Sequence, residues 1–256
     1  MQNSHKWLSR FRIKSNTWVY VPTSETIKEG RFLKNLIEFK WLPPSNYYHL
    51  RSGGHVDAIK YHLGGKFFIH ADLKKFFNSI NRSRITRELK PYFGYEKARN
   101  IAMESTVSIP LESGQAFALP FGFVQFTIIA SLCLRKSTLG KTIHKLNGTD
   151  GIKVSVYVDD IIISTQSLEE AVRALAMIHE SSERSGLVLN REKLKGPAEN
   201  ITAFNIDLSG SAVAINAARF GELLYNYKNA STDKQRTGIW GYVSSVNSAQ
   251  ADLLIR

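Results

Sequence analysis

The stretch that decides the fold is VSVYVDDIII, residues 154–163. Two apolar runs flank the adjacent carboxylates Asp159 and Asp160, and this pattern predicts two short β-strands joined by a tight turn. Two aspartates beside so hydrophobic a core carry a large desolvation cost unless a cation compensates them, and hard oxygen ligands favour magnesium. A turn that uses Asp only for backbone reasons is the alternative that this stretch alone leaves open.

A third carboxylate occupies a comparable position earlier in the chain. The apolar run FFIHA, residues 67–71, ends in Asp72, and a polar turn and a segment of helical periodicity at residues 83–93 follow. If Asp72 lies beside Asp159 and Asp160, the three would hold two divalent cations about 3.5–4 Å apart, an arrangement that stabilises in-line phosphoryl transfer. For Asp72 alone, an acid at the surface end of a strand is the alternative.

Four segments of the chain resemble motifs A to D of reverse transcriptases, in the family's order. Residues 71–77, ADLKKFF, are similar to motif A, and residues 157–160, YVDD, are similar to motif C. Residues 118–125, ALPFGFVQ, resemble motif B, and residues 186–193, GLVLNREK, resemble motif D. The version of motif B looks most like that of the bacterial defence-associated reverse transcriptases of the unclassified groups.

The resemblance implies an α+β fold. It would be a right-hand polymerase palm, an antiparallel sheet with helices, joined to basic fingers and a short helical thumb. We expect residues 1–66 to form the basic N-terminal part of the fingers, residues 67–208 the palm with interleaved fingers, and residues 209–256 the short thumb.

Local patterns predict further elements. Ser167 and Glu170 have the spacing of a capping box, so a helix is expected to begin there, with Val172, Leu175 and Ile178 on its apolar face. Three more segments are expected to be helical and one to be a strand: helices within residues 56–62, 124–134 and 217–256, and a strand at residues 201–208.

The resemblance also implies a reaction and its residues. Asp72, Asp159 and Asp160 would be catalytic and would bind two Mg²⁺ ions, which Mn²⁺ is able to replace. A primer 3′-hydroxyl would attack the α-phosphate of a deoxynucleoside triphosphate and release pyrophosphate. Four further residues would bind the substrate: Leu73, Phe77, Gly122 and Lys193.

Several of these roles have an ordinary structural alternative. A bulky aromatic at Phe77 would exclude a ribose 2′-hydroxyl, but Phe77 could also be a core residue, and its neighbour Phe76 competes for that place. Lys193 would protonate the pyrophosphate, or it is an exposed lysine near Lys195. Many relatives carry Gln where this chain has Phe121, so a packing role and a substrate role are both open there.

Charge is distributed unevenly along the chain. The net charge is +12, and residues 1–100 hold 19 Lys and Arg against 7 Asp and Glu, whereas the remainder holds 15 of each. An excess of this kind favours binding to polyanions through the release of counterions. The candidate nucleic-acid contacts are Arg10, Arg12, Arg31, Lys34 and Arg51, and interspersed aromatic residues could stack on single-stranded bases.

These observations lead to one main interpretation and three alternatives. We expect an RNA template, of which a cognate noncoding RNA is one form, a DNA product and deoxynucleotides as partners. Because the expected thumb is short, we also expect self-association or a companion protein. The single Cys133 and the lack of a long apolar run favour a cytoplasmic protein without a membrane span. The alternatives are a retron or group II intron type enzyme, a catalytically idle scaffold that binds RNA, and an RNA-dependent RNA polymerase.

Overall fold

The computed structural model describes residues 6–14, 17–111 and 114–255. They form two compact units, each assembled from three separate segments of the chain. Unit 1 comprises residues 1–45, 73–141 and 181–188, and unit 2 comprises residues 46–72, 142–180 and 189–256. The division at residues 66 and 208 stays a prediction.

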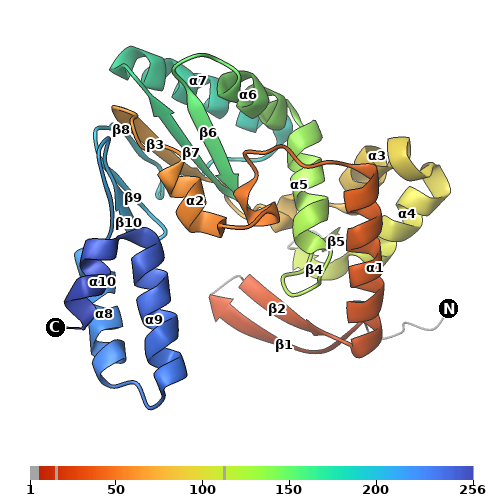
Figure 1. Ribbon diagram of the computed structural model, residues 1–256. Coiled ribbons are helices and arrows are strands. Elements are labelled where there is room, and N and C mark those ends of the chain that lie inside the picture. The colour runs from red at the N-terminus through yellow and green to blue at the C-terminus, as the bar shows by residue number, and fades with distance from the viewer. Residues whose placement is uncertain (1–5, 15–16, 112–113, 256) are drawn as a thin grey trace. The chain divides into compact units, whose positions relative to one another are not determined.

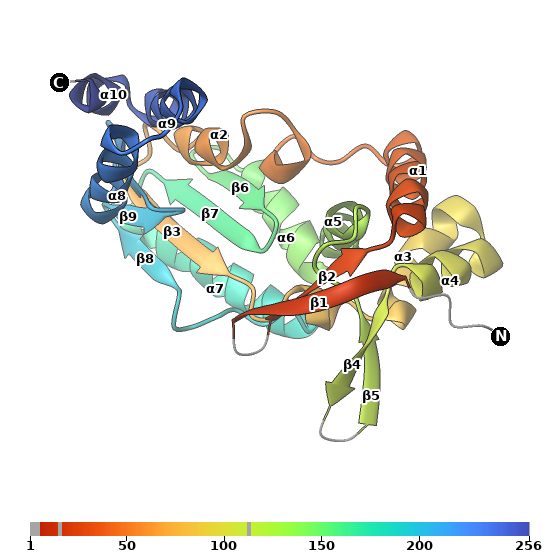
Figure 2. The same cartoon turned by 90° about the horizontal axis from the view of Figure 1, so that it is seen from below.

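A four-stranded antiparallel sheet forms the centre of unit 2. Its order is β6 (Lys153–Tyr157), β7 (Asp160–Thr165), β3 (Phe67–Asp72) and β8 (Lys195–Ala198). The helix α2 (Gly54–Lys60) lies against one face of the sheet and α7 (Leu168–Ser185) against the other, as Figures 1 and 2 show. The hairpin predicted within residues 154–163 is confirmed as β6 and β7, and the apolar run at residues 67–71 is confirmed as strand β3.

The helix α7 begins with the predicted capping box. The Ser167 backbone N–H donates to Glu170 Oε2, and the Glu170 N–H donates to Ser167 Oγ, both over 3.2 Å. The expected buried face is wrong in one position, because Val172 is 53% exposed whereas Ala171, Ala174 and Ile178 are buried. Val172 is turned about 100° from Ala171 around the helix axis, which is enough to move it from the core into solvent.

A second, three-stranded sheet follows in unit 2, in the order β11 (Val213–Ile215), β10 (Ile206–Leu208) and β9 (Ile201–Ala203). The prediction of one strand over residues 201–208 is therefore wrong: it is a hairpin with a turn at Phe204 and Asn205. The buried residues show why, since burial falls on odd positions in β9 and on even positions in β10. A continuous strand would have sent Ile206 and Leu208 into solvent.

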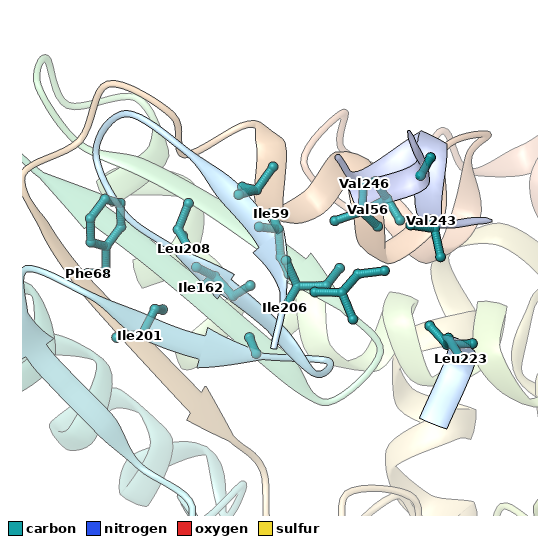
Figure 3. Packing of buried hydrophobic residues seen from close by; sticks show 14 of the residues in the cluster. Val56, Ile59, Phe68, Ile162, Ile201, Ile206, Leu208, Leu223, Val243 and Val246 are labelled. Carbon is teal, nitrogen blue, oxygen red and sulfur yellow. The ribbon is translucent and has the colours of Figure 1, made fainter. Parts of the chain in front are cut away.

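Three helices complete unit 2: α8 (Ala217–Lys228), α9 (Asp233–Val246) and α10 (Ser248–Leu254). They confirm the predicted helical C-terminal segment. Their apolar residues join the same core cluster as the strands, and Figure 3 shows Leu223, Val243 and Val246 with Val56 and Ile206. Of the C-terminal aromatics, Tyr227 and Tyr242 pack against this cluster, whereas Tyr225 and Trp240 are exposed.

Unit 1 is mainly helical, with two β-hairpins. Its helices are α1 (Ser24–Lys40), α3 (Arg82–Phe93), α4 (Tyr95–Glu104) and α5 (Phe126–Lys136), and its hairpins are β1 (Trp7–Lys14) with β2 (Thr17–Pro22) and β4 (Val107–Leu111) with β5 (Gly114–Ala118). The buried helix expected at residues 124–134 is confirmed as α5, in which every residue from Ile128 to Leu134 is buried.

The first hairpin is anchored to the segment before α5. Tyr20 donates its backbone N–H to the Phe121 carbonyl over 2.8 Å, and its side chain packs with Val107 and Phe123. Gly122 has φ +108°, and a Cβ there would lie 2.1 Å from the Tyr20 carbonyl oxygen. Glycine is therefore required at this position by the close approach of β2.

Two 3₁₀ turns, η1 (Tyr48–Leu50) and η2 (Phe77–Ser79), and the helix α6 (Thr138–Asn147) link these elements. Among the residues that the structure describes, no helix is both long enough and apolar enough to cross a membrane.

Candidate active site

The three predicted carboxylates lie at one end of the sheet in unit 2. Asp72, the last residue of β3, is directly opposite Asp160, the first residue of β7, in the antiparallel register. Asp159 precedes Asp160 in the turn that joins β6 to β7. The turn and the strand end thus bring together residues that are far apart in sequence.

Asp72 is held by two side chains from the segment before β8. It is only 5% exposed, its Oδ1 accepts from Asn190 Nδ2 over 3.1 Å, and its Oδ2 accepts from Lys193 Nζ over 2.9 Å. The hydrogen bond to Asp72, aided by the nearby carboxylates, raises the pKa of Lys193. The structure thus brings Lys193 together with the predicted carboxylates.

Asp160 is paired with a histidine from the neighbouring strand. His70 Nε2 lies 2.7 Å from Asp160 Oδ1, and His70 itself is buried. No hydrogen-bond partner for His70 Nδ1 occurs in the described part of the chain. Because alternate residues of a strand share one face, His70 points to the same side of β3 as Asp72.

Asp159 experiences the charge of the other two carboxylates. Burial first, and then repulsion from Asp160 and Asp72, raise the pKa of Asp159 to about 6. A partly buried carboxylate under this repulsion is stabilised either by a proton or by a cation. The electrostatics of the site therefore favour a positive ligand.

The donors suit a hard divalent cation, since all three are carboxylates. The described residues nevertheless include no group of three or more His, Cys, Asp or Glu side chains arranged to hold a metal ion. Two of the three carboxylates already have partners, so ligation by Asp72 would compete with its ion pair to Lys193. The three carboxylates therefore have the chemistry that a divalent cation requires, but the cation would have to compete with Lys193 for Asp72.

The turn that carries Asp159 is strained and is fixed by a second histidine. Val158 has φ +62°, a region that β-branched residues rarely adopt. Its backbone N–H donates to His49 Nδ1 over 2.8 Å, which requires a ring nitrogen without a proton. Burial lowers the pKa of His49 to about 4, so the ring stays neutral and can accept this bond at neutral pH.

An aromatic wall adjoins the turn. The ring of Phe204, at the tip of the β9–β10 hairpin, lies 5.3 Å from that of Tyr157, 5.6 Å from that of His55 and 6.0 Å from that of His70. Tyr242 of α9 also contacts His55. The site is thus bordered by residues from both sheets of unit 2 and from its C-terminal helices.

The other predicted substrate residues belong to unit 1. Leu73 and Phe77 are buried, and the Phe77 side chain, 2% exposed, packs 4.5 Å from the ring of Phe121 and 4.8 Å from that of Phe126. Gly122 has the packing reason given above. Core packing thus accounts for Phe77 and Gly122 within unit 1, and their substrate roles stay predictions.

The predicted nucleic-acid residues are spread over both units. Arg10 and Arg12 lie over the ring of Trp18, at 4.5 and 4.8 Å. Lys34 pairs with Glu38 within α1, and Arg51 in unit 2 lies over the ring of Tyr48. Arg31 is exposed on α1.

Two residues that contact the carboxylates directly, His70 and Asn190, were not predicted from the sequence. His70 could have been found, because it lies two positions before Asp72 on a predicted strand and so shares its face. Asn190 gave no such signal, since it lies in an irregular segment whose path depends on the rest of the fold.

An antiparallel sheet with helices on its faces and carboxylates at the ends of its central strands is the arrangement of a polymerase palm, as the resemblance implied. The chain belongs to the reverse transcriptase (RNA-dependent DNA polymerase) family, whose profile matches residues 24–204. Among curated proteins it is similar to the retron Ec86 reverse transcriptase of Escherichia coli, with 23% identity over 210 residues. That match covers 80% of this chain and 62% of the relative's length.

Solved structures support the fold. A telomerase from Candida albicans, solved with a TWJ fragment of telomeric RNA, matches with a TM-score of 0.53 and 11% identity, over 91% of this chain and 47% of that one. Telomerase of Candida tropicalis without ligand matches with a TM-score of 0.52 and 14% identity, over 80% and 43%. At such low identity the likeness concerns the fold alone.

Proposed function

We propose that this chain is an RNA-directed DNA polymerase that adds deoxynucleotides to a primer 3′-hydroxyl. The observation that best supports this activity is the meeting of three carboxylates at one end of the sheet in unit 2. Burial, together with the repulsion between these carboxylates, raises the pKa of Asp159 to about 6 and so favours a bound cation. Family membership agrees with this chemistry.

Each residue of the site has a part in this proposal. Asp72 and Asp159 would hold two Mg²⁺ ions, or Mn²⁺ in their place, and Asp160 would support them. When bound, such ions stabilise the charge on the attacking and leaving oxygens. Lys193, protonated at Nζ, would hold a proton for the departing pyrophosphate. Leu73, Phe77 and Gly122 would contact the nucleotide, with Phe77 excluding a 2′-hydroxyl.

The biological setting is a further part of the proposal. Template RNA, DNA product and deoxynucleotides would be the partners, in the cytoplasm, with self-association or a companion protein to retain the duplex. Antiviral defence with a noncoding RNA follows from the resemblance to the unclassified bacterial groups. Similarity to the Ec86 enzyme favours a retron type as the second candidate.

Primer extension tests the activity directly. We expect the purified protein to extend a DNA primer on an RNA template with deoxynucleotides and Mg²⁺ or Mn²⁺, and to stop when a chelator removes the metal. Asp72→Asn provides the blank. A folded wild-type protein that binds the primed RNA but never extends it, with either metal, would instead be the idle scaffold.

His70 is expected to act as a positioning residue for Asp160. His70→Leu removes the 2.7 Å contact, and loss of such a supporting partner typically lowers metal affinity by about 10- to 100-fold. His70→Gln, which retains a donor, is expected to restore most of that affinity. Mn²⁺ binding followed by electron paramagnetic resonance measures this without turnover. Equal affinities in His70→Leu and wild type would show that Asp160 needs no such support.

A further inference from the structure

A basic groove lies between two helices of unit 1. It has a volume of about 600 Å³ and lies between α3 and α4. The residues that line it include four cations and no acidic residue: Arg82, Ser83, Thr86, Arg87, Lys90, Tyr95, Arg99 and Met103. The groove is confined to unit 1, whereas the carboxylates belong to unit 2.

Helical spacing builds both walls of the groove. Arg82, Thr86 and Lys90 follow one another at intervals of four along α3, which places them in one row. Tyr95, Arg99 and Met103 form the matching row on α4. With a rise of 1.5 Å per residue, each row is about 12 Å long. The groove is thus an elongated channel with cationic and aromatic residues along it.

Arg82 and Arg99 of the groove are held in place and retain donors. Arg82 donates Nε to Thr106 Oγ1 over 2.8 Å and lies 3.4 Å over the ring of Phe117. Arg99 donates to the hydroxyl of Tyr95 over 3.3 Å. A guanidinium has five N–H donors, so these bonds leave others for a ligand. Arg87 is paired with Glu88 over 2.8 Å, and this ion pair weakens the attraction of Arg87 for a phosphate.

Tyr95 distinguishes this groove from a merely charged surface. Its side chain is 54% exposed beside the cations, and the bond from Arg99 holds its hydroxyl. Proteins that bind single strands combine a cationic track for phosphates with exposed aromatic rings on which bases stack. An acidic peptide would use the cations but would have no use for an exposed ring.

We propose that the α3–α4 groove binds a single-stranded nucleic acid, with its phosphates on the cations and a base on Tyr95. RNA template and DNA product share this backbone, so either is a source of the ligand. The proposal goes beyond polymerisation, and it is tested without metal ion or nucleotide. A failure of binding at the groove would therefore not contradict the proposed polymerase chemistry. A failure of primer extension would likewise not contradict binding at the groove.

Salt-dependent binding tests the cations. The probes are labelled oligouridine and oligothymidine of about 16 nucleotides, followed by fluorescence anisotropy. We expect Arg87→Glu with Lys90→Glu to reduce the slope of log Kd against log salt by about 1.4 with a probe that uses the groove, since each lost phosphate contact on a single strand contributes about 0.7. Lys228→Glu with Lys234→Glu makes the same change in net charge on exposed residues of unit 2 and is expected to leave the slope unchanged.

Tyr95 tests the stacking. We expect Tyr95→Ala to weaken binding on the order of tenfold, and Tyr95→Phe to weaken it by less than about twofold because the ring remains. If the variants lose affinity for both probes, the groove recognises the backbone that RNA and DNA share. If they lose affinity for one probe only, that probe identifies whether the ligand is RNA or DNA. The proposal is overturned if the two charge-reversal pairs act equally, if Tyr95→Phe is as weak as Tyr95→Ala, or if polyglutamate competes as well as the oligonucleotides. Circular dichroism confirms that each variant is folded.

Discussion

Asp159→Asn is expected to abolish nucleotide incorporation while the protein melts at the same or a higher temperature. Asp159 is partly buried beside Asp160 and Asp72, and burial followed by repulsion from these carboxylates raises its pKa to about 6. The neutral amide removes an anion that would bind the metal, and it also removes the repulsion. Removing a carboxylate that we propose to bind the metal is thus expected to reduce activity but not folding.

The sign of the stability change depends on pH. A carboxyl whose folded pKa lies above its unfolded value of 3.8 stabilises the fold when protonated, and this contribution is lost as pH rises through about 6. In the metal-free protein at about pH 8, the ionised Asp159 costs on the order of 3 kcal/mol, since each pKa unit is about 1.4 kcal/mol. Asp159→Asn should therefore raise the melting temperature at about pH 8 and leave it nearly unchanged at about pH 4.

Scanning calorimetry in chelator, together with primer extension in Mg²⁺, measures both effects. Asp150→Asn is the matched control, because Asp150 is exposed and lies outside the site. We expect it to retain activity and to show no such pH-dependent gain. Full extension by Asp159→Asn would remove Asp159 from the catalytic residues.

Gly122→Ala is expected to destabilise unit 1 strongly. Its Cβ would lie 2.1 Å from the Tyr20 carbonyl oxygen, and the backbone at φ +108° disfavours any side chain. The neighbouring Tyr20 N–H to Phe121 carbonyl bond resists a shift of the chain. The combined clash and backbone strain at this position are expected to cost about 3 kcal/mol or more.

Gly221→Ala provides the control for this prediction. Gly221 lies within α8, and nothing approaches a Cβ built there within 4 Å. Alanine is expected to stabilise the protein by about 0.5–1 kcal/mol, because it has the higher helix propensity. Urea unfolding compares the two variants. If Gly122→Ala is as stable as wild type, β2 must be able to move away from the turn, and packing against Tyr20 does not explain the glycine.

The carboxylates could be placed from the sequence because each follows an apolar strand, and strand ends are visible as a change from apolar to polar residues. The partners of those carboxylates could not all be placed in this way. The bonds of Lys193 and Asn190 to Asp72 depend on where the segment before β8 returns to the sheet. That return is set by tertiary packing rather than by local pattern.

Two local errors have distinct causes. The turn at Phe204 and Asn205 lacks the glycine that usually marks a two-residue hairpin, although both residues have positive φ, so one strand was expected there. In α7, Val172 is apolar but exposed, whereas the small Ala171 and Ala174 face the core. Hydrophobicity alone favoured the larger side chain, while close packing selected the smaller ones.

The interlaced composition of the two units has a consequence for synthesis. Unit 1 is complete only when residues 181–188 exist, since Ser185 Oγ accepts from the Leu139 N–H and the Val188 carbonyl accepts from the Lys74 N–H. In unit 2, the ion pair of Lys193 with Asp72 joins residues 121 positions apart. Such separations slow folding. Until the ribosome has translated Val188, neither unit has all of its residues. The apolar strand β3 therefore emerges uncovered and must avoid aggregation until its neighbouring strands are translated.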